Sequence, residues 1–164
     1  WCCLVGSEMC IRDRDAAAAA AALGEQLLVW GLREDDAYAR QVESSVPKGT
    51  IDWRGFRSTQ ELQQEMGHCR ALINTPKWNE AYGNVVVEAL ACGVPVVAYD
   101  RGGPGELICS GRTGWLVPPD DVAALTRRFG ASTASIAPSA AAGLKSTPLV
   151  RSSVSVLKLG FEQD

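Results

Sequence analysis

Short apolar runs alternate with longer amphipathic segments over most of the chain. The apolar runs predict strands, because a strand buried on both faces reads as a continuous apolar stretch. The predicted strands are 26–32, 51–56, 71–75, 94–100 and 114–117. The predicted helices are 15–23, 35–46, 59–69 and 85–92, with one more from Asp120 or Asp121 to about Phe129. Strands and helices in alternation predict a parallel sheet with helices on both faces, which is an α/β domain.

Local signals set the starts and ends of two of these helices. Ser58 and Glu61 have the spacing of a capping box at the start of the third helix. Asn84 is the predicted N-cap of the fourth helix, which Gly93 ends. In that register Glu88 lies one turn beyond Asn84, on the same helix face.

Two glutamates flank the junction between the strand 71–75 and the fourth helix. Glu80 lies in the loop, and the Glu88 side chain leans back toward the helix start, so both carboxylates face one small volume. The helix start also offers unpaired N–H groups and a dipole end equivalent to roughly half a positive charge. A phosphate suits that end and carboxylates bind hydroxyls, so the junction predicts a nucleotide sugar as ligand.

Ligands of such sheets bind beyond the carboxyl ends of the strands, which directs attention to two further loops. Gly55, Phe56 and Arg57 follow the second predicted strand. Phe56 could hold a nucleotide base there, or pack on the next helix as a hydrophobic staple, and the residues leave both readings open. In the turn 101–104, paired glycines permit a tight bend near the predicted phosphates.

Composition and charge narrow the class of protein. The 164 residues, 46% of them hydrophobic, are enough for one α/β domain with a core but not for two full lobes. The net charge of −3 leaves no basic stripe for nucleic acid. No apolar run approaches the roughly 18 residues of a membrane span, and no export signal is present, so we expect a cytoplasmic protein.

Cysteine and histidine positions give no sign of a metal site. Three of the six cysteines crowd the first ten residues, and the others stand singly at Cys69, Cys92 and Cys109. No spacing fits zinc, so we predict no metal and no cofactor. His68, the one histidine, falls late in a predicted helix, where a packing or surface role is expected.

A long block of sequence carries a family resemblance. The stretch TPKWNEAYGNVVVEALACGVPVVAYDRGGPGE, 75–106, together with GRTGWLVPPDD, 111–121, closely resembles the donor-binding half of family 4 retaining glycosyltransferases. The signature of that family is a glutamate, seven residues and a second glutamate. The resemblance implies the C-terminal, Rossmann-like half of a GT-B fold. It also implies transfer of a hexose from a nucleotide sugar with retention and without a bound metal.

The resemblance also implies roles for individual residues. Glu80 would stand at the catalytic centre and contact hydroxyls of the transferred sugar, and Glu88 would bind the ribose. The backbone that meets the diphosphate and sugar would be that of Tyr82, Gly83, Asn84 and Val85. The loop of Gly55, Phe56 and Arg57 would approach the base. A narrower similarity, to bacterial enzymes related to UDP-glucose:tetrahydrobiopterin glucosyltransferase, would imply UDP-glucose as donor and a small pterin as acceptor.

Both ends of the chain depart from the family pattern. Residues 1–14 show no strand or helix period and look like translated sequencing adapter, so we expect the first strand of the domain 15–129 to be missing. In the family that region holds a loop whose Arg and Lys grip the diphosphate, and neither Arg12 nor Arg14 stands in such a motif. The Ser-, Ala- and Pro-rich tail 130–164 is expected to have little order, as an out-of-frame translation or a flexible linker.

Three classes of function follow. The first is a hexosyltransferase, for which this chain supplies the donor-binding lobe while the N-terminal acceptor lobe and an acceptor, a small molecule or a glycan, are missing. The isolated chain is then expected to be inactive. The second is another GT-B enzyme, such as a nucleotide-sugar epimerase or a phosphorylase. The third is a nucleotide-binding module or an inert fragment.

Overall fold

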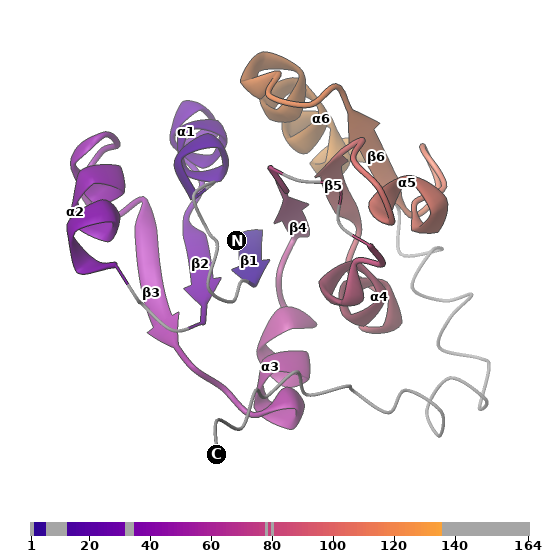
Figure 1. The fold of residues 1–164 in the computed structure, drawn as a ribbon, viewed down its shortest axis with the longest axis horizontal. Helices are drawn as coiled ribbons and strands as arrows, with labels where there is room; N and C mark the ends of the chain where they lie inside the picture. The colour runs from indigo at the N-terminus through magenta and orange to yellow at the C-terminus, as the bar shows by residue number, and fades with distance from the viewer. Residues whose placement is uncertain (1, 6–12, 32–34, 78, 80, 136–164) are drawn as a thin grey trace.

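The computed structural model describes residues 2–5, 13–31, 35–77, 79 and 81–135. Six parallel strands form one sheet in the order β3-β2-β1-β4-β5-β6 (Figure 1). The strands are β1 Cys2–Val5, β2 Leu27–Trp30, β3 Ile51–Gly55, β4 Ala71–Asn74, β5 Val96–Tyr99 and β6 Gly114–Val117. The helices are α1 Asp13–Leu23, α2 Asp36–Ser44, α3 Thr59–Met66, α4 Asn84–Ala91, α5 Pro104–Leu107 and α6 Val122–Ser135. The predicted α/β architecture with a parallel sheet is confirmed.

Two hydrophobic clusters lie on the two faces of the sheet. Successive strand residues belong to opposite clusters, as the alternation of side chains along a strand requires: Ile73 packs in the cluster with α1, α2 and α6, and Leu72 in the cluster with α3 and α4. The alanines of α1 let helices pack closely there. A Cβ built on Gly130 of α6 would lie 3.2 Å from Leu23 Cδ2. The sheet is therefore covered on both faces.

The strand β1 corrects one prediction. Cys2–Val5 pairs in parallel with both β2 and β4, so the expectation that the first strand is missing is wrong. A strand in a sheet that is covered on both faces needs no polar alternation, and the four residues CCLV form a continuous apolar run. The absence of a period in 1–14 therefore did not exclude a strand. Residues 6–12, with Arg12, lie outside the described residues, and the adapter origin of the segment stays a prediction.

The helix α6 corrects a second boundary. This helix was predicted to end at about Phe129, but it continues to Ser135. Asp121 supplies the cap, because its Oδ1 accepts a hydrogen bond of 2.8 Å from the Ala124 N–H. Asp120 precedes it with a left-handed φ of 63°. Residues 136–164 lie outside the described residues, so the expectations for that part of the tail stay predictions.

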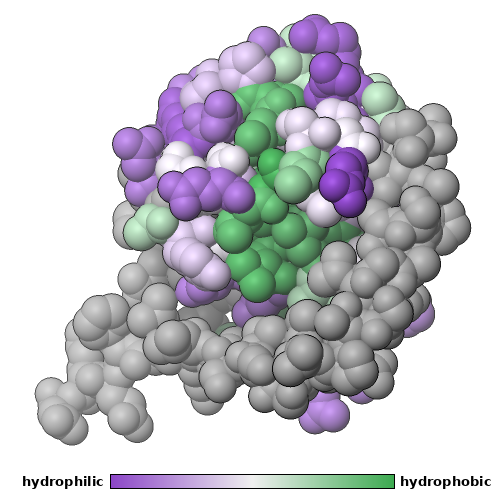
Figure 2. Space-filling model, turned by 90° about the vertical axis from the view of Figure 1, so that its right-hand side faces the viewer, coloured by the Kyte–Doolittle hydropathy of each residue, from purple (hydrophilic) through white to green (hydrophobic). Residues whose placement is uncertain are grey.

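The strand β6 forms one edge of the sheet. The side of the molecule that carries β6 and α5 in Figure 1 faces the viewer in Figure 2, where hydrophobic residues gather at the centre with hydrophilic residues around them.

Among the described residues, no helix has the length and apolar character to cross a membrane. The cytoplasmic location stays a prediction.

Candidate functional site

The start of α4 lies at the carboxyl end of β4, beside the β1/β4 position at which the strand order reverses. Gly83 is the N-cap, with the left-handed angles φ 87° and ψ 53°, and no side chain in the described part of the chain caps the helix. The prediction that Asn84 is the cap is wrong, since Asn84 is the first helical residue. The Val86 N–H donates to the Gly83 carbonyl at 2.9 Å. The N–H groups of Asn84 and Val85 have no acceptor within the helix, as in any first turn, and are available to an anion.

The end of the loop before α4 packs against the turn that follows β5. A Cβ on Gly103 would lie 2.3 Å from the carbonyl oxygen of Tyr82, so only glycine permits this approach of the two backbones. A Cβ on Gly83 would lie 3.5 Å from Pro104. The Tyr82 side chain is nevertheless 59% exposed. The loop therefore fixes the Tyr82 backbone and leaves its phenol ring available for a ligand.

Glu88 is a half-buried carboxylate on α4, four residues after Asn84. Burial raises its pKa above the usual range for a glutamate. Burial, and then the charge of Glu88, raise the pKa of the Cys92 thiol, which lies one turn further along α4. The Glu88 carboxylate makes no hydrogen bond or ion pair with another described residue, although the Glu88 carbonyl accepts from the Cys92 N–H at 3.0 Å. A ligand hydroxyl would supply the hydrogen bond that its charged form lacks here.

The predicted partner of Glu88 cannot be placed. Glu80, the expected catalytic-site residue, lies outside the described residues, as does Trp78. The structure thus brings Glu88 together on one helix start with Tyr82, Gly83, Asn84 and Val85. The predicted pairing of the two carboxylates stays a prediction.

The loop after β3 holds the other predicted donor-binding residues. Gly55 has a left-handed φ of 65° and is exposed. The Phe56 side chain is 63% exposed, which excludes a packed hydrophobic staple. The Arg57 Nε donates to Glu65 Oε1 at 3.1 Å, and its Nη1 donates to the Phe56 carbonyl at 3.1 Å. The Arg57 charge is therefore engaged by the protein, while Phe56 remains open to a ligand.

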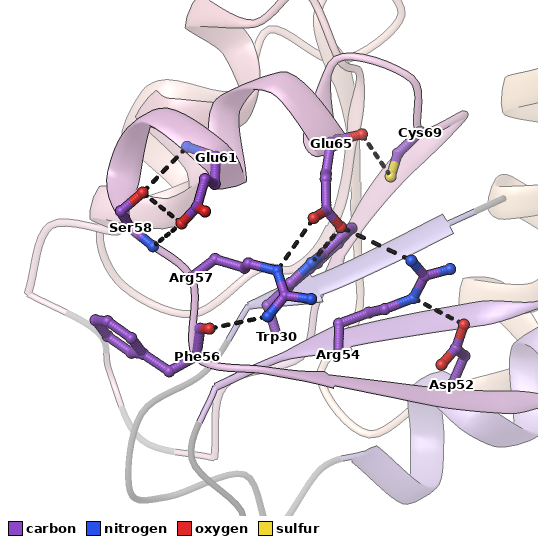
Figure 3. A network of polar contacts seen from close by, with 9 residues as sticks. All are labelled: Trp30, Asp52, Arg54, Phe56, Arg57, Ser58, Glu61, Glu65 and Cys69. Atoms are coloured by element: carbon purple, nitrogen blue, oxygen red, sulfur yellow. Dashed lines mark hydrogen bonds and ion pairs between the residues drawn. The ribbon is translucent and has the colours of Figure 1, made fainter.

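Glu65 joins this loop to two strands (Figure 3). Its Oε2 accepts a hydrogen bond of 2.9 Å from the Trp30 indole and lies 4.0 Å from Arg54 Nη1. Burial acts to raise the pKa of Glu65, but the hydrogen bonds from Trp30 and Arg57 and the arginine charges outweigh it and lower that pKa. Sequence patterns gave no sign of this network, because its members come from β2, β3 and α3.

The predicted capping box at α3 is confirmed. The Ser58 N–H donates to Glu61 Oε2 at 3.0 Å, and the Glu61 N–H donates to Ser58 Oγ at 3.4 Å. The start of α3 is therefore closed by side chains, unlike that of α4.

Two polar side chains near α4 were not among the predicted site residues. The Arg101 guanidinium donates to the carbonyls of Pro76 at 3.3 Å and Lys77 at 2.7 Å and pairs with Asp120. The side-chain nitrogen of Asn74 is buried and has no hydrogen-bond partner among the described residues. A polar residue that ends the otherwise apolar strand ALIN was the available signal for Asn74.

The two loops lie on the same edge of the sheet. Between β3 and β4 there are three strand spacings, which is on the order of 14 Å. The exposed Phe56 ring and the α4 start can thus be bridged only by an extended ligand. Among the described residues no three metal-ligating side chains gather in one place.

Known proteins share the sequence pattern and the fold of this chain. The model of the family described as Glycosyl transferases group 1 matches residues 18–131. The chain resembles HepE of Anabaena, solved with UDP-glucose, at 26% identity and a TM-score of 0.71, over 88% of this chain and 43% of that one. The fold is also that of sucrose-phosphate synthase from Thermosynechococcus elongatus, at 24% identity and a TM-score of 0.74, over 88% of this chain and 38% of that one.

A curated relative matches over a shorter segment. The alpha-1,3/1,6-mannosyltransferase alg-2 of Neurospora crassa is 49% identical over 53 residues, which are 32% of this chain and 11% of the mannosyltransferase. The chain therefore spans less than half of the length of the relatives named here.

Proposed function

The chain belongs to the glycosyl transferases group 1 family, and from this premise we propose that it is the donor-binding lobe of a retaining hexosyltransferase that uses a UDP-sugar. The observation that carries the proposal is the start of α4. Free N–H groups, the helix dipole and the half-buried Glu88 meet there without a side-chain cap. The likeness to HepE, which was solved with UDP-glucose, supports the choice of a UDP-sugar of the glucose type.

Each group takes one part of the donor. The N–H groups of Asn84 and Val85 and the positive dipole end bind the diphosphate, whose charge grows as it leaves. The Glu88 carboxylate accepts hydrogen bonds from the ribose hydroxyls. Phe56 and the backbone of Gly55 receive the base. Glu80 contacts the hydroxyls of the hexose, as the family resemblance implies.

The helix start replaces a metal ion in this proposal. The leaving diphosphate is stabilised by N–H donors that are already oriented, so little reorganisation accompanies the reaction. The nucleotide sugar is a substrate, and the reaction includes no other cofactor. The acceptor, a small molecule or a glycan, would be held by a separate lobe, so the proposal for this chain is tested through donor binding.

Calorimetric titration with UDP, GDP and ADP tests it. We expect the chain to bind UDP more tightly than GDP or ADP. Glu88→Ala should weaken UDP binding about tenfold or more, because hydrogen bonds to a charged group contribute about 1.5–3 kcal/mol. Glu43→Ala, on α2 at the opposite face of the sheet, is the matched control and should leave UDP binding unchanged. Failure of all three nucleotides to bind would refute the proposal.

A further inference from the structure

Arg101 joins three segments that are far apart in sequence. Its guanidinium donates to two successive carbonyls, those of Pro76 and Lys77, and pairs with the carboxylate of Asp120. Its side chain is only 20% exposed, while that of Asp120 is 61% exposed. The buried end of this ion pair therefore lies against the beginning of the loop 75–83, which connects β4 to α4.

The same turn also contacts the end of that loop. Gly103, two residues after Arg101, lies against the Tyr82 backbone so closely that a Cβ there would clash at 2.3 Å. Pro104 lies against Gly83, the N-cap of α4. The turn 101–104 thus holds the loop at both ends, at one end through a side chain and at the other through backbone packing.

We propose that Arg101 is a positioning residue of the nucleotide-sugar site: it fixes the beginning of the loop 75–83, so that the N–H groups at the start of α4 are held in the geometry that binds a diphosphate. The inference rests on the proposed function, because it gives Arg101 a role in that site. Arg101 does this through the Pro76 and Lys77 carbonyls and does not itself need to touch the ligand.

Arginine is required at this position for a geometric reason. Two carbonyls and a carboxylate surround the side chain, and a planar guanidinium with five N–H donors can serve all three at once. The ammonium of lysine is a compact point charge on a flexible stem and cannot span the same three acceptors. Asp120 completes the arrangement from a left-handed backbone conformation, which asparagine also tolerates. Asp120→Asn therefore removes the charge and leaves the backbone in place.

The test compares Arg101→Lys and Asp120→Asn with Arg70→Lys in the full chain. Arg70 is the matched control, because it also forms an ion pair, with Glu25. Arg70 directly precedes β4 and so lies at the amino edge of the sheet, away from the loop that follows this strand. Amide hydrogen exchange over residues 76–87 reports the order of the loop without any ligand. UDP titration of the same proteins reports the site, and urea unfolding reports global stability.

We expect Arg101→Lys to accelerate exchange over 76–87 and to weaken UDP binding about tenfold, because small misplacements of a binding group are costly. Asp120→Asn should have the same effects to a smaller degree. Arg70→Lys should change neither, even where it lowers the free energy of unfolding as much. This pattern would separate positioning from a general loss of stability.

Two results would overturn the inference. Unchanged exchange over 76–87 in Arg101→Lys would show that Arg101 does not hold the loop. Faster exchange with unchanged UDP affinity would show that the loop order does not matter for the site. Failure of the unsubstituted chain to bind UDP would instead refute the proposed function, and the exchange data would still decide whether Arg101 holds the loop.

Discussion

The helices α3 and α4 both start at the carboxyl edge of the sheet, yet their starts are built in opposite ways. At α3 the Ser58 and Glu61 side chains accept hydrogen bonds from each other's N–H groups in a capping box. At α4 the cap is Gly83, which has no side chain, and no side chain of the described residues caps the first turn. Two βα units that are consecutive in sequence thus have one helix start with a side-chain cap and one without.

The carboxylates near these two helix starts show the same contrast. Hydrogen bonds from Ser58 lower the pKa of Glu61, and those from Trp30 and Arg57 lower the pKa of Glu65 against the effect of burial. Burial without such partners raises the pKa of Glu88. The carboxylates of α3 are thus stabilised in their charged form by the protein itself, whereas in our proposal a ligand stabilises the charged form of Glu88. In our proposal, polar groups without a partner in the described part of the chain therefore indicate the ligand site better than the number of charged residues does.

Gly83→Ala should disturb the open helix start most. Alanine at φ 87° is strained, which we expect to lower the free energy of unfolding by about 1–2 kcal/mol. The shift of the first turn of α4 should also weaken UDP binding more than tenfold. Urea unfolding and UDP titration measure the two effects.

Gly24→Ala is the control for this variant. Gly24 has a similar left-handed φ of 66°, and a Cβ there would meet nothing within 4 Å. It should lose similar stability and keep its UDP affinity. Equal loss of UDP binding in both variants would mean that strain alone, and not the α4 start, is responsible.

Ser58→Ala should open the closed helix start. Loss of an N-cap side chain lowers the free energy of unfolding by about 1 kcal/mol. UDP affinity should stay within about twofold, because α3 does not supply the anion-binding N–H groups in our proposal. Ser44→Ala, at the end of α2, is a suitable control for stability. A large loss of UDP binding in Ser58→Ala would erase the functional difference between the two helix starts.

Glu88→Gln should have the smallest effect on stability, and of the opposite sign. Because burial raises the pKa of Glu88 in the folded protein, ionisation of this group destabilises the fold. That cost is absent below the pKa of the unfolded chain and appears as the pH rises through the raised pKa. The variant should therefore be slightly more stable than the unsubstituted chain at neutral pH and equal to it in acid.

Glu65→Gln provides the reverse case. The pKa of Glu65 is lowered, so its contribution to stability is present at neutral pH and is lost as the pH falls through that lowered pKa. Urea unfolding between pH 7 and pH 3 measures both variants. If Glu88→Gln proved less stable than the unsubstituted chain at pH 7, Glu88 would be a structural group and not a ligand-binding one.

The sequence predicted the elements well where local chemistry decides them. The capping box of Ser58 and Glu61 and the strand Gly114–Val117 occur as predicted. The α4 start was misplaced by one residue, because asparagine is a good N-cap and the tertiary contact of Gly83 with Pro104 is invisible in the sequence.

Two other features depended on the whole sheet. The strand β1 was missed because its place between β2 and β4 is set by pairing with residues far along the chain. The contacts of Arg101 likewise join two loops that are far apart in sequence, since Pro76 is 25 residues and Lys77 is 24 residues away. Local patterns carry no information about such contacts, whereas the topology of a doubly wound sheet did predict the edge on which they lie.

The central place of β1 has a practical consequence for producing the protein. In the sheet order, Cys2–Val5 is the one strand between the pair β3-β2 and the trio β4-β5-β6. A truncation that removed these four residues would leave two unpaired strand edges facing each other, and such edges are templates for aggregation. Removal of Cys2–Val5 is therefore expected to yield insoluble protein.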